Sequence, residues 1–469
     1  MNPVFYIVAL LFLAGGLGIF LVNRKLPQPG KRKNWLKYFV YLLIVITIIG
    51  SLTVEKQVFT ALVILINAVG ILEMMRVKAN SEQSVRGDRF QVISLSVYAV
   101  FLLFFLLFVL LPARYILYTY VIVLVFDGAS QVTGQLAGRK KLLPAISPGK
   151  TWEGLTGGFL VAIVTSVCIR QSVDFSVFPS LIWGFLLCCA AFSGDILASF
   201  YKRTFKTKDF SNLLPEHGGM FDRFDSFIAA GALAGIAGIP YLAAHPPDKN
   251  IAVYLLITWL FFMVLLAGEI IQHVFKVRSE WVRMSSHVAA GVISLLLLNQ
   301  FSSRWYVLAI CIQSALFLGA TGLMGFFISH HKVRRKTLGS PLFFAGILLA
   351  YMSSDWFGNN GLFIIPVLVM TISDPSAAWA GLNFGTRHWK NHITNEYSSK
   401  TLVGSAVFFA VSLVILYTCL PVYYELAVTE QVALSILISL AATIAEAASS
   451  NGLDNVTVPV LIVILMMIL

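Results

Sequence analysis

Long apolar stretches recur from one end of this chain to the other, and they constrain its fold more than any other feature. A helix needs about 20 predominantly apolar residues to cross the hydrocarbon core of a membrane. Of the 469 residues, 58% are hydrophobic and only 12% are charged, about half the charged fraction of a typical soluble domain. The sequence therefore predicts an all-α polytopic integral membrane protein.

We expect about 15–16 transmembrane helices from the length of these stretches. Residues 1–20 lack a basic start and a small-residue cleavage site, so we interpret the first stretch as a retained span and not a signal peptide. The candidate spans are 5–22, 37–54, 57–76, 91–112, 115–134, 155–170, 178–198, 226–243, 251–272, 285–300, 304–329, 339–352, 361–380, 401–419, 430–448 and 456–469.

The basic residues lie almost entirely on one side of this predicted topology. Of the 34 Lys and Arg residues, the opposite side holds only Lys56, Arg114, Arg170, Lys249 and Arg304. This asymmetry places the basic side in the cytoplasm, as the positive-inside rule describes. The net charge of +12 therefore reflects topology and contact with anionic lipid headgroups, and it does not predict binding of nucleic acid.

Charged residues and glycines are concentrated in three long cytoplasmic connections, 127–154, 194–226 and 373–404, and acids recur in a shorter one, 446–459. Ionisable residues near membrane depth mark functional sites by default. A transporter is one alternative, but it would place its acids and its helix breaks near the middle of the spans. Here the acids lie at span ends, which favours an enzyme.

The connection 194–226 has the composition of a magnesium and phosphate site. Its three carboxylates, Asp195, Asp222 and Asp225, offer the hard oxygen ligands that Mg²⁺ prefers. Basic side chains can neutralise phosphate oxygens, and paired glycines let the backbone approach a phosphate closely. The basic residues and glycines of this connection are Lys202, Arg203, Lys206, Lys208, Arg223, Gly218 and Gly219. For any one basic pair beside a span, the alternative interpretation is a solvated charged loop.

The order and spacing of these residues resemble the signature of the phosphatidate cytidylyltransferase family. The matching elements are S-x-x-K-R from Ser199, K-D from Lys208, P-x-H-G-G from Pro215 and D-R-x-D from Asp222. Upstream, Asp127 precedes a stretch similar to the family motif S-P-x-K-T-x-E-G, which begins at Ser147. The resemblance implies transfer of CMP from CTP to phosphatidate, which yields CDP-diacylglycerol and pyrophosphate.

The same resemblance implies roles for individual residues. Asp195 and Asp222 would hold Mg²⁺, with Asp225 in support, and a monovalent cation such as K⁺ is a further candidate. Lys202 and Arg203 complete the implied catalytic set. The substrate-binding residues would be Asp127, Ser147, Lys150 and Thr151 for CTP, and Lys208, His217, Gly218, Gly219 and Arg223 for the phosphates of both substrates.

Part of this pattern is repeated in the second half of the chain. Asp374, Gly381 and Gly385 have the spacing of Asp127, Gly134 and Gly138, and the Lys400-Thr401 pair follows them as Lys150-Thr151 follows the first set. Glu446 with Asp454 forms a shortened counterpart of Asp195 with Asp222. We therefore predict two related bundles with cytoplasmic catalytic loops, at 1–250 and 251–469.

The second-half elements resemble the CTP-dependent lipid-alcohol kinases, the dolichol and phytol kinase group. That group has an R-K-x-x-H motif, which appears here from Arg283 to His287 with Met284 in the Lys position. The resemblance implies a kinase acting on diacylglycerol or a polyprenol. An alternative is a non-catalytic second half that only completes a pseudo-dimer. The implied second-half site comprises Arg283, His287, Asp374, Lys400, Thr401, Glu446, Asp454 and Asn455.

The charge of the two site regions fits different acceptors. Phosphatidate is anionic, so its site needs cations that hold two negative substrates together, and 194–226 is rich in them. A lipid alcohol is neutral, and between Glu446 and Asp454 there is no Lys or Arg. The expected partners are CTP, phosphatidate and other membrane lipids, with a homodimer as a further hypothesis. The expected location is a bacterial inner membrane, with both sites facing the cytoplasm.

Overall fold

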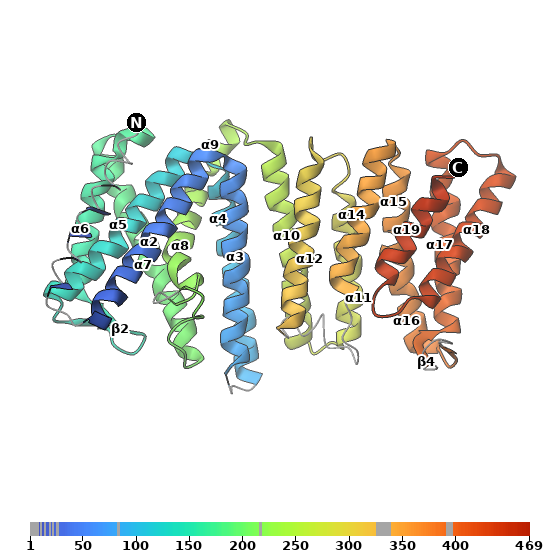
Figure 1. The fold of residues 1–469 in the computed structure, drawn as a ribbon, viewed down its shortest axis with the longest axis horizontal. Helices are drawn as coiled ribbons and strands as arrows, with labels where there is room; N and C mark the ends of the chain where they lie inside the picture. Colours follow the sequence, from blue (N-terminus) through green and yellow to red (C-terminus); the bar gives the residue numbers. More distant parts are fainter. Residues whose placement is uncertain are drawn as a thin grey trace. The chain divides into compact units, whose positions relative to one another are not determined.

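The computed structural model describes residues 28–81, 85–214, 218–324, 339–390 and 397–469, together with single positions before residue 28. The described chain is helical apart from two short β-hairpins, which confirms the all-α class. It divides into two compact units, Met1–Ile251 and Ala252–Leu469 (Figure 1). Each unit is described by itself below.

In the described part of the chain, ten helices are long and apolar enough to cross a membrane. Every one of them coincides with a predicted span. The other predicted spans fall mainly on shorter helices or, for 5–22, largely outside the described residues. In several of the shorter helices, polar residues interrupt the apolar stretch. Asp222 and Asp225 do so near the start of α8. The ten long helices are α2, α3, α4, α5, α7, α10, α12, α15 through α16, α17 and α18.

The first unit is built around α8, which packs against α4, α5 and α7. Small residues let these helices approach closely, since a Cβ atom added to Gly235 would lie 2.0 Å from the carbonyl oxygen of Phe104. Its elements are α2 (Gln28–Val54), α3 (Lys56–Ala79), α4 (Val85–Leu110), α5 (Ala113–Ala137), β1 (Lys141–Leu143), β2 (Ser147–Thr151), α6 (Trp152–Cys168), η1 (Arg170–Val173), α7 (Val177–Thr204), α8 (Phe221–Ala237) and α9 (Ile239–Ala244).

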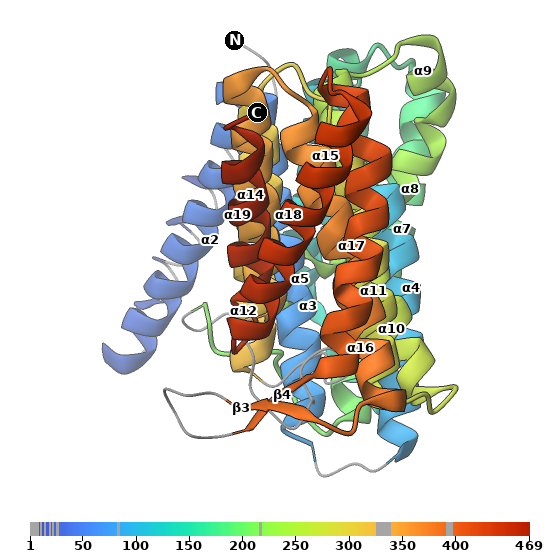
Figure 2. The ribbon, with the colours of Figure 1, turned by 90° about the vertical axis from the view of Figure 1, so that its right-hand side faces the viewer.

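The second unit begins within α10 and ends with α19. Its hairpin, formed by β3 and β4, lies beside α16 and α17 (Figure 2). One long span is built from α15, a π-helical turn η2 and α16, so the helix is locally widened just before Asp374. Its elements are α10 (Lys249–His273), α11 (Ser279–Leu295), α12 (Arg304–Leu323), α14 (Gly339–Phe357), α15 (Gly361–Leu368), η2 (Val369–Ser373), α16 (Asp374–Phe384), β3 (His388–Lys390), β4 (Tyr397–Thr401), α17 (Leu402–Tyr423), α18 (Val428–Ala448) and α19 (Asp454–Met466).

The repeat expected from the glycine spacing is present as a repeated arrangement of helices. In the first unit α5 contacts α6, α6 contacts α7, α7 contacts α8, and α8 contacts α4. In the second unit α16, α17, α18, α19 and α14 make the same succession of contacts. An antiparallel two-stranded hairpin follows α5 in one unit and α16 in the other.

The junction between the hairpin and the helix that follows it, here called the joint, has the same structure in both units. Thr151 caps α6 by accepting a hydrogen bond from the amide of Gly154, and Thr401 caps α17 by accepting one from Gly404, both at 3.1 Å. A Cβ added to Gly138 would lie 2.8 Å from the hydroxyl oxygen of Thr151. The glycines of the repeat therefore make room for the threonine caps.

We expect Gly138→Ala to destabilise the first unit, because its new methyl group would collide with the carbonyl oxygen of Gly134 and with Thr151. Overpacking of this kind typically costs about 1–3 kcal/mol, which should lower the apparent Tm in detergent by several degrees. The matched control is Gly128→Ala in the same helix, since a Cβ there would meet nothing within 4 Å. Equal melting temperatures for the two variants would contradict this account of the joint.

Candidate active site

The polar residues of the first unit gather where the β1–β2 hairpin meets the end of α7 and the start of α8. Arg203, at the end of α7, joins these segments. Its Nε donates to the carbonyl oxygen of Ile146 in the hairpin at 3.1 Å, and its Nη1 donates to that of Thr207 at 2.7 Å. The guanidinium predicted to be catalytic thus holds the hairpin against the 205–220 connection.

A lysine–carboxylate pair links the hairpin to α7. The ammonium of Lys150 forms an ion pair with Asp195 and lies 4.8 Å from the centre of the Phe192 ring. Asp195 also accepts a hydrogen bond from the hydroxyl of Ser199 at 3.3 Å. Both charged side chains remain partly exposed, at 25% and 30%, so a ligand can reach them.

A second pair is much more deeply buried. Lys202 and Asp222 are 2.5 Å apart and only 10% and 3% exposed. The other oxygen of Asp222 accepts from the backbone amides of Phe210, at 2.9 Å, and Gly219, at 2.8 Å. Asp222 therefore fixes both ends of the connection between α7 and α8.

The backbone conformation next to this pair requires a glycine, Gly218. Gly218 has φ of +81°, a conformation that side chains other than glycine rarely adopt. A Cβ there would also lie 2.9 Å from Asp222 Oδ2. The backbone at Gly218 and Gly219 thus lies close to Asp222 at the start of α8, and its predicted approach to a phosphate stays a prediction.

Three other carboxylates, those of Asp127, Asp195 and Asp225, influence one another electrostatically. Lys150 and Arg223 act on Asp127, and Lys202 acts on Asp225. The carboxylate of Asp225 also accepts from the amide of Ser226 at 2.7 Å. The predicted ion-holding pair was Asp195 and Asp222, with Asp225 in support, but the oxygens of Asp222 are held by Lys202 and two loop amides, and Asp127 joins Asp195 and Asp225 in the electrostatic group. The magnesium assignment stays a prediction.

Sequence reasoning missed Glu73, which organises the same connection from α3. Its carboxylate is 5% exposed and accepts from the hydroxyl of Ser211 at 2.5 Å and the amides of Met220 and Phe221 at 2.9 and 2.8 Å. A carboxylate at this position stabilises the N-terminus of α8. The sequence signal was present, since Glu73 is the one acid within the apolar stretch 57–76.

The remaining predicted residues of the first unit occupy its edge. Ser147 and Thr151 lie at the two ends of β2, and the side chain of Lys208 is exposed on the connection after α7. His217 lies outside the described residues.

The second unit holds a tighter cluster. The ammonium of Lys400 lies 2.6 Å from a carboxylate oxygen of Glu446, 2.6 Å from one of Asp454, and 2.6 Å from the backbone carbonyl of Glu446. One carboxylate oxygen from each of Asp374, Glu446 and Asp454 lies within 4.8 Å of the others. Among the described residues, these three acids form the one group of His, Cys, Asp or Glu side chains that lie close enough to share an ion.

Lys400 is charged in this setting. Burial lowers the pKa of its ammonium, but Asp454, Glu446 and Asp374 outweigh burial, so the pKa lies above its ordinary value. Lys400 therefore offsets one of the three negative charges around it across the physiological pH range.

The other predicted second-unit residues surround the cluster. His287 on α11 donates through Nε2 to the carbonyl oxygen of Met370 at 3.1 Å. Arg283 and Asp374 act on His287 electrostatically. Asn455 donates from its side chain to the carbonyl oxygen of Gly339 at 3.0 Å, which ties the start of α19 to α14.

The two clusters share several contacts. The Lys150–Asp195 pair matches the Lys400–Glu446 pair. Asp454 forms an ion pair with a lysine, as Asp222 does, and it accepts a hydrogen bond from the amide of the next residue, as Asp225 does. Asp454 therefore combines contacts that the first unit divides between two aspartates one helical turn apart.

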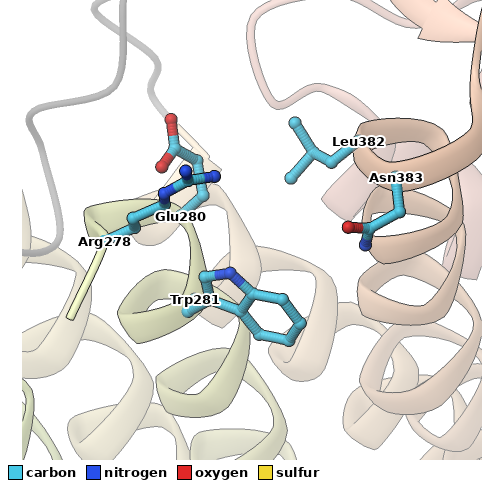
Figure 3. Close-up of a pocket in the computed structure, with 5 residues that line it drawn as sticks. All are labelled: Arg278, Glu280, Trp281, Leu382 and Asn383. Carbon is cyan, nitrogen blue, oxygen red and sulfur yellow. The ribbon is translucent and has the colours of Figure 1, made fainter.

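A pocket of about 320 Å³ opens near the second cluster. Arg278, Glu280 and Trp281, at the start of α11, form one side of it (Figure 3). Across from them are Leu382 and Asn383, near the end of α16. With a rise of about 1.5 Å per residue, this wall of the pocket lies roughly 12 Å along α16 from Asp374.

Comparison with known proteins places a family match within the first unit. Residues 91–238 match the family model described as "Cytidylyltransferase family". The chain is 39% identical over 117 residues to the phosphatidate cytidylyltransferase of Staphylococcus aureus (strain COL). It is 40% identical over 120 residues to that of Staphylococcus haemolyticus (strain JCSC1435), and 42% identical over 120 residues to that of Staphylococcus epidermidis (strain ATCC 12228 / FDA PCI 1200).

Each alignment covers 24% of this chain and 45% of the relative. The chain thus spans less than half the length of the curated relatives it matches. The 91–238 match contains every predicted site residue of the first unit, from Asp127 to Asp225. The first half is therefore similar to cytidylyltransferases in the region that carries its site.

We expect Glu73→Gln to loosen the 205–220 connection. Both oxygens of Glu73 accept hydrogen bonds, so whichever way the amide is turned, its NH₂ group faces a donor. A buried donor without an acceptor costs about 1–3 kcal/mol, so the apparent Tm and the activity should both fall. Glu55→Gln is the control, because Glu55 is exposed and forms no side-chain cap. A Tm equal to that of the control would contradict an anchoring role for Glu73.

Proposed function

We propose that the first unit transfers CMP from CTP to phosphatidate, forming CDP-diacylglycerol and pyrophosphate. The observation that carries the proposal is the set of cations around its acidic trio, Lys150, Lys202 and Arg223. CTP and phosphatidate both carry negative charge, so a site that joins them must offset their repulsion. The family match over the same residues supports the same reaction.

The chemistry needs positioning more than proton transfer. A phosphate oxygen of phosphatidate attacks the α-phosphorus of CTP, and the bond from that phosphorus to the bridging oxygen of pyrophosphate breaks. The attacking oxygen is already deprotonated, so no general base is required. Lys150, at the end of the hairpin, is placed to hold the triphosphate beside the N-terminus of α6, where backbone N–H groups favour anions.

The acids of the first unit are suited to Mg²⁺, which takes carboxylate oxygens together with substrate phosphates. The donors to Asp222 already occupy both of its oxygens. Asp127, Asp195 and Asp225 influence one another electrostatically instead, so we assign to them an ion that the substrate phosphates help to hold, and we assign Asp222 to holding the loop. A bound Mg²⁺ would offset charge on the pyrophosphate that leaves.

We further propose that the second unit phosphorylates a lipid alcohol with CTP. The observation that favours it is the excess of acids in the second cluster, where Lys400 is the cation in direct contact with Glu446 and Asp454. A neutral hydroxyl acceptor needs a base and no cationic cradle of its own. The basic connections favour a cytoplasmic orientation of both sites, and we propose a bacterial inner membrane as their location.

The first-unit reaction is tested by incubating purified full-length protein in detergent with phosphatidate, Mg²⁺ and CTP labelled at the α-phosphate. We expect labelled CDP-diacylglycerol, and we expect Asp225→Asn to lower its rate by about 10²-fold or more, as loss of one electrostatic group in an active site typically does. The control is Asp174→Asn, because Asp174 is 72% exposed in an ion pair with Arg114. No labelled lipid from folded wild-type protein would refute the proposal.

The second-unit reaction is tested with CTP labelled at the γ-phosphate and with diacylglycerol or a polyprenol as acceptor. We expect label in the lipid, and we expect Asp374→Asn to abolish this transfer while CDP-diacylglycerol formation persists. Absence of γ-label in every lipid, together with an unchanged first reaction in Asp374→Asn, would instead identify the second unit as a structural partner.

A further inference from the structure

We propose that the second unit holds a divalent cation, Mg²⁺ or Mn²⁺, between the carboxylates of Asp374, Glu446 and Asp454. The three residues come from three different helices, α16, α18 and α19, so the fold and not a local motif brings them together. The site concerns cation binding alone and stands whether or not the second unit transfers phosphate.

The spacing of the three oxygens is close to what such an ion requires. Bonds from oxygen to Mg²⁺ are about 2.1 Å long, so two ligands on opposite sides of the ion lie about 4.2 Å apart. The three oxygens already lie within 4.8 Å of one another. Small side-chain movements would therefore complete the geometry, without rearrangement of the helices.

Glu446 provides an independent sign of a missing partner. Its side chain is 7% exposed, and one of its oxygens pairs with Lys400. Its other oxygen, Oε2, is buried and has no hydrogen-bond partner among the described residues. A buried carboxylate oxygen without a donor is costly, and the ligand that satisfies a carboxylate oxygen among other carboxylates is a cation.

The charge of the cluster leads to the same conclusion. Lys400 has three N–H donors, and three acceptors are already in contact with it, the carbonyl and carboxylate of Glu446 and the carboxylate of Asp454. Lys400 balances one negative charge of three. Like charges this close in a poorly solvated site are strongly unfavourable, and a divalent ion would neutralise the remainder.

Comparison of the two units shows that fewer basic residues of the chain act on the acids of the second unit. Around the acids of the first unit the chain supplies Lys150, Lys202 and Arg223. Around those of the second it supplies Lys400 and Arg283, with His287. Hard oxygen ligands select Mg²⁺ or Mn²⁺ over softer metals, and the free positions on such an ion suit phosphate oxygens.

The test is Mn²⁺ binding to full-length protein in detergent, followed by electron paramagnetic resonance in an Asp225→Asn background that weakens the first-unit site. We expect a bound Mn²⁺ to remain in this background. Adding Glu446→Gln should raise its Kd by at least about tenfold, in the range seen when metal-site residues are altered. Adding Glu425→Gln, at an exposed acid of the same unit, should leave the Kd unchanged. No bound Mn²⁺ in the background, or equal Kd values for the two additions, would overturn the proposal.

A second measurement needs no substitution and so does not depend on a variant that folds. Fe²⁺ with ascorbate and peroxide cuts the backbone next to a bound metal ion, and the wild-type protein should be cut near residues 374, 446 and 454, with protection by excess Mg²⁺. Cuts confined to the first unit would overturn the second-unit site. Cuts at the second unit in a protein that makes no CDP-diacylglycerol would refute the first-unit reaction and leave this site standing.

Discussion

In each unit, a lysine at the end of a β-hairpin reaches an acid on a later helix, and the polar site forms around that contact. Lys150 meets Asp195 in the first unit, and Lys400 meets Glu446 in the second. The contact is possible because the next residue, a threonine, caps the following helix and fixes where the hairpin ends. The glycines at the end of the preceding helix leave room for that threonine. The site thus depends on a backbone joint that has little freedom to move.

The two units share this joint but differ in the charged residues around it. The first unit adds a buried Lys202–Asp222 pair, whose acid also holds two amides of the 205–220 connection. Removing one partner of such a pair leaves an uncompensated buried charge, at a cost of about 3–5 kcal/mol. The second unit places Asp374, Glu446 and Asp454 together around one lysine. The difference fits the proposed anionic acceptor in the first unit and the proposed neutral acceptor in the second.

The membrane helices and the internal repeat could be predicted from the sequence. Long apolar stretches predict the helices, and the matched spacing of acids and glycines predicts the repeat. All ten long helices coincide with predicted spans, and Asp127 and Asp374 each lie in the acidic cluster of their unit. The sequence could not show which acids face one another. Asp222 and Asp225 are one turn apart on α8 and so lie on the same side of the helix, and only packing decides that Asp222 is the one that pairs with Lys202. Glu73 was missed because its partners follow it by more than 130 residues.

The second cluster bears on whether the second unit is only a structural partner of the first. A partner that merely completes a bundle would be more stable with apolar residues at these positions, since replacing buried charges by well-packed apolar side chains is often neutral or stabilising. Instead the chain keeps three acids, one of them with an unpartnered buried oxygen, next to a charged lysine. It also builds the same threonine cap and glycine joint a second time. A charged arrangement that works against packing is explained by a ligand that the arrangement binds, which favours the proposed cation site over a purely structural second unit.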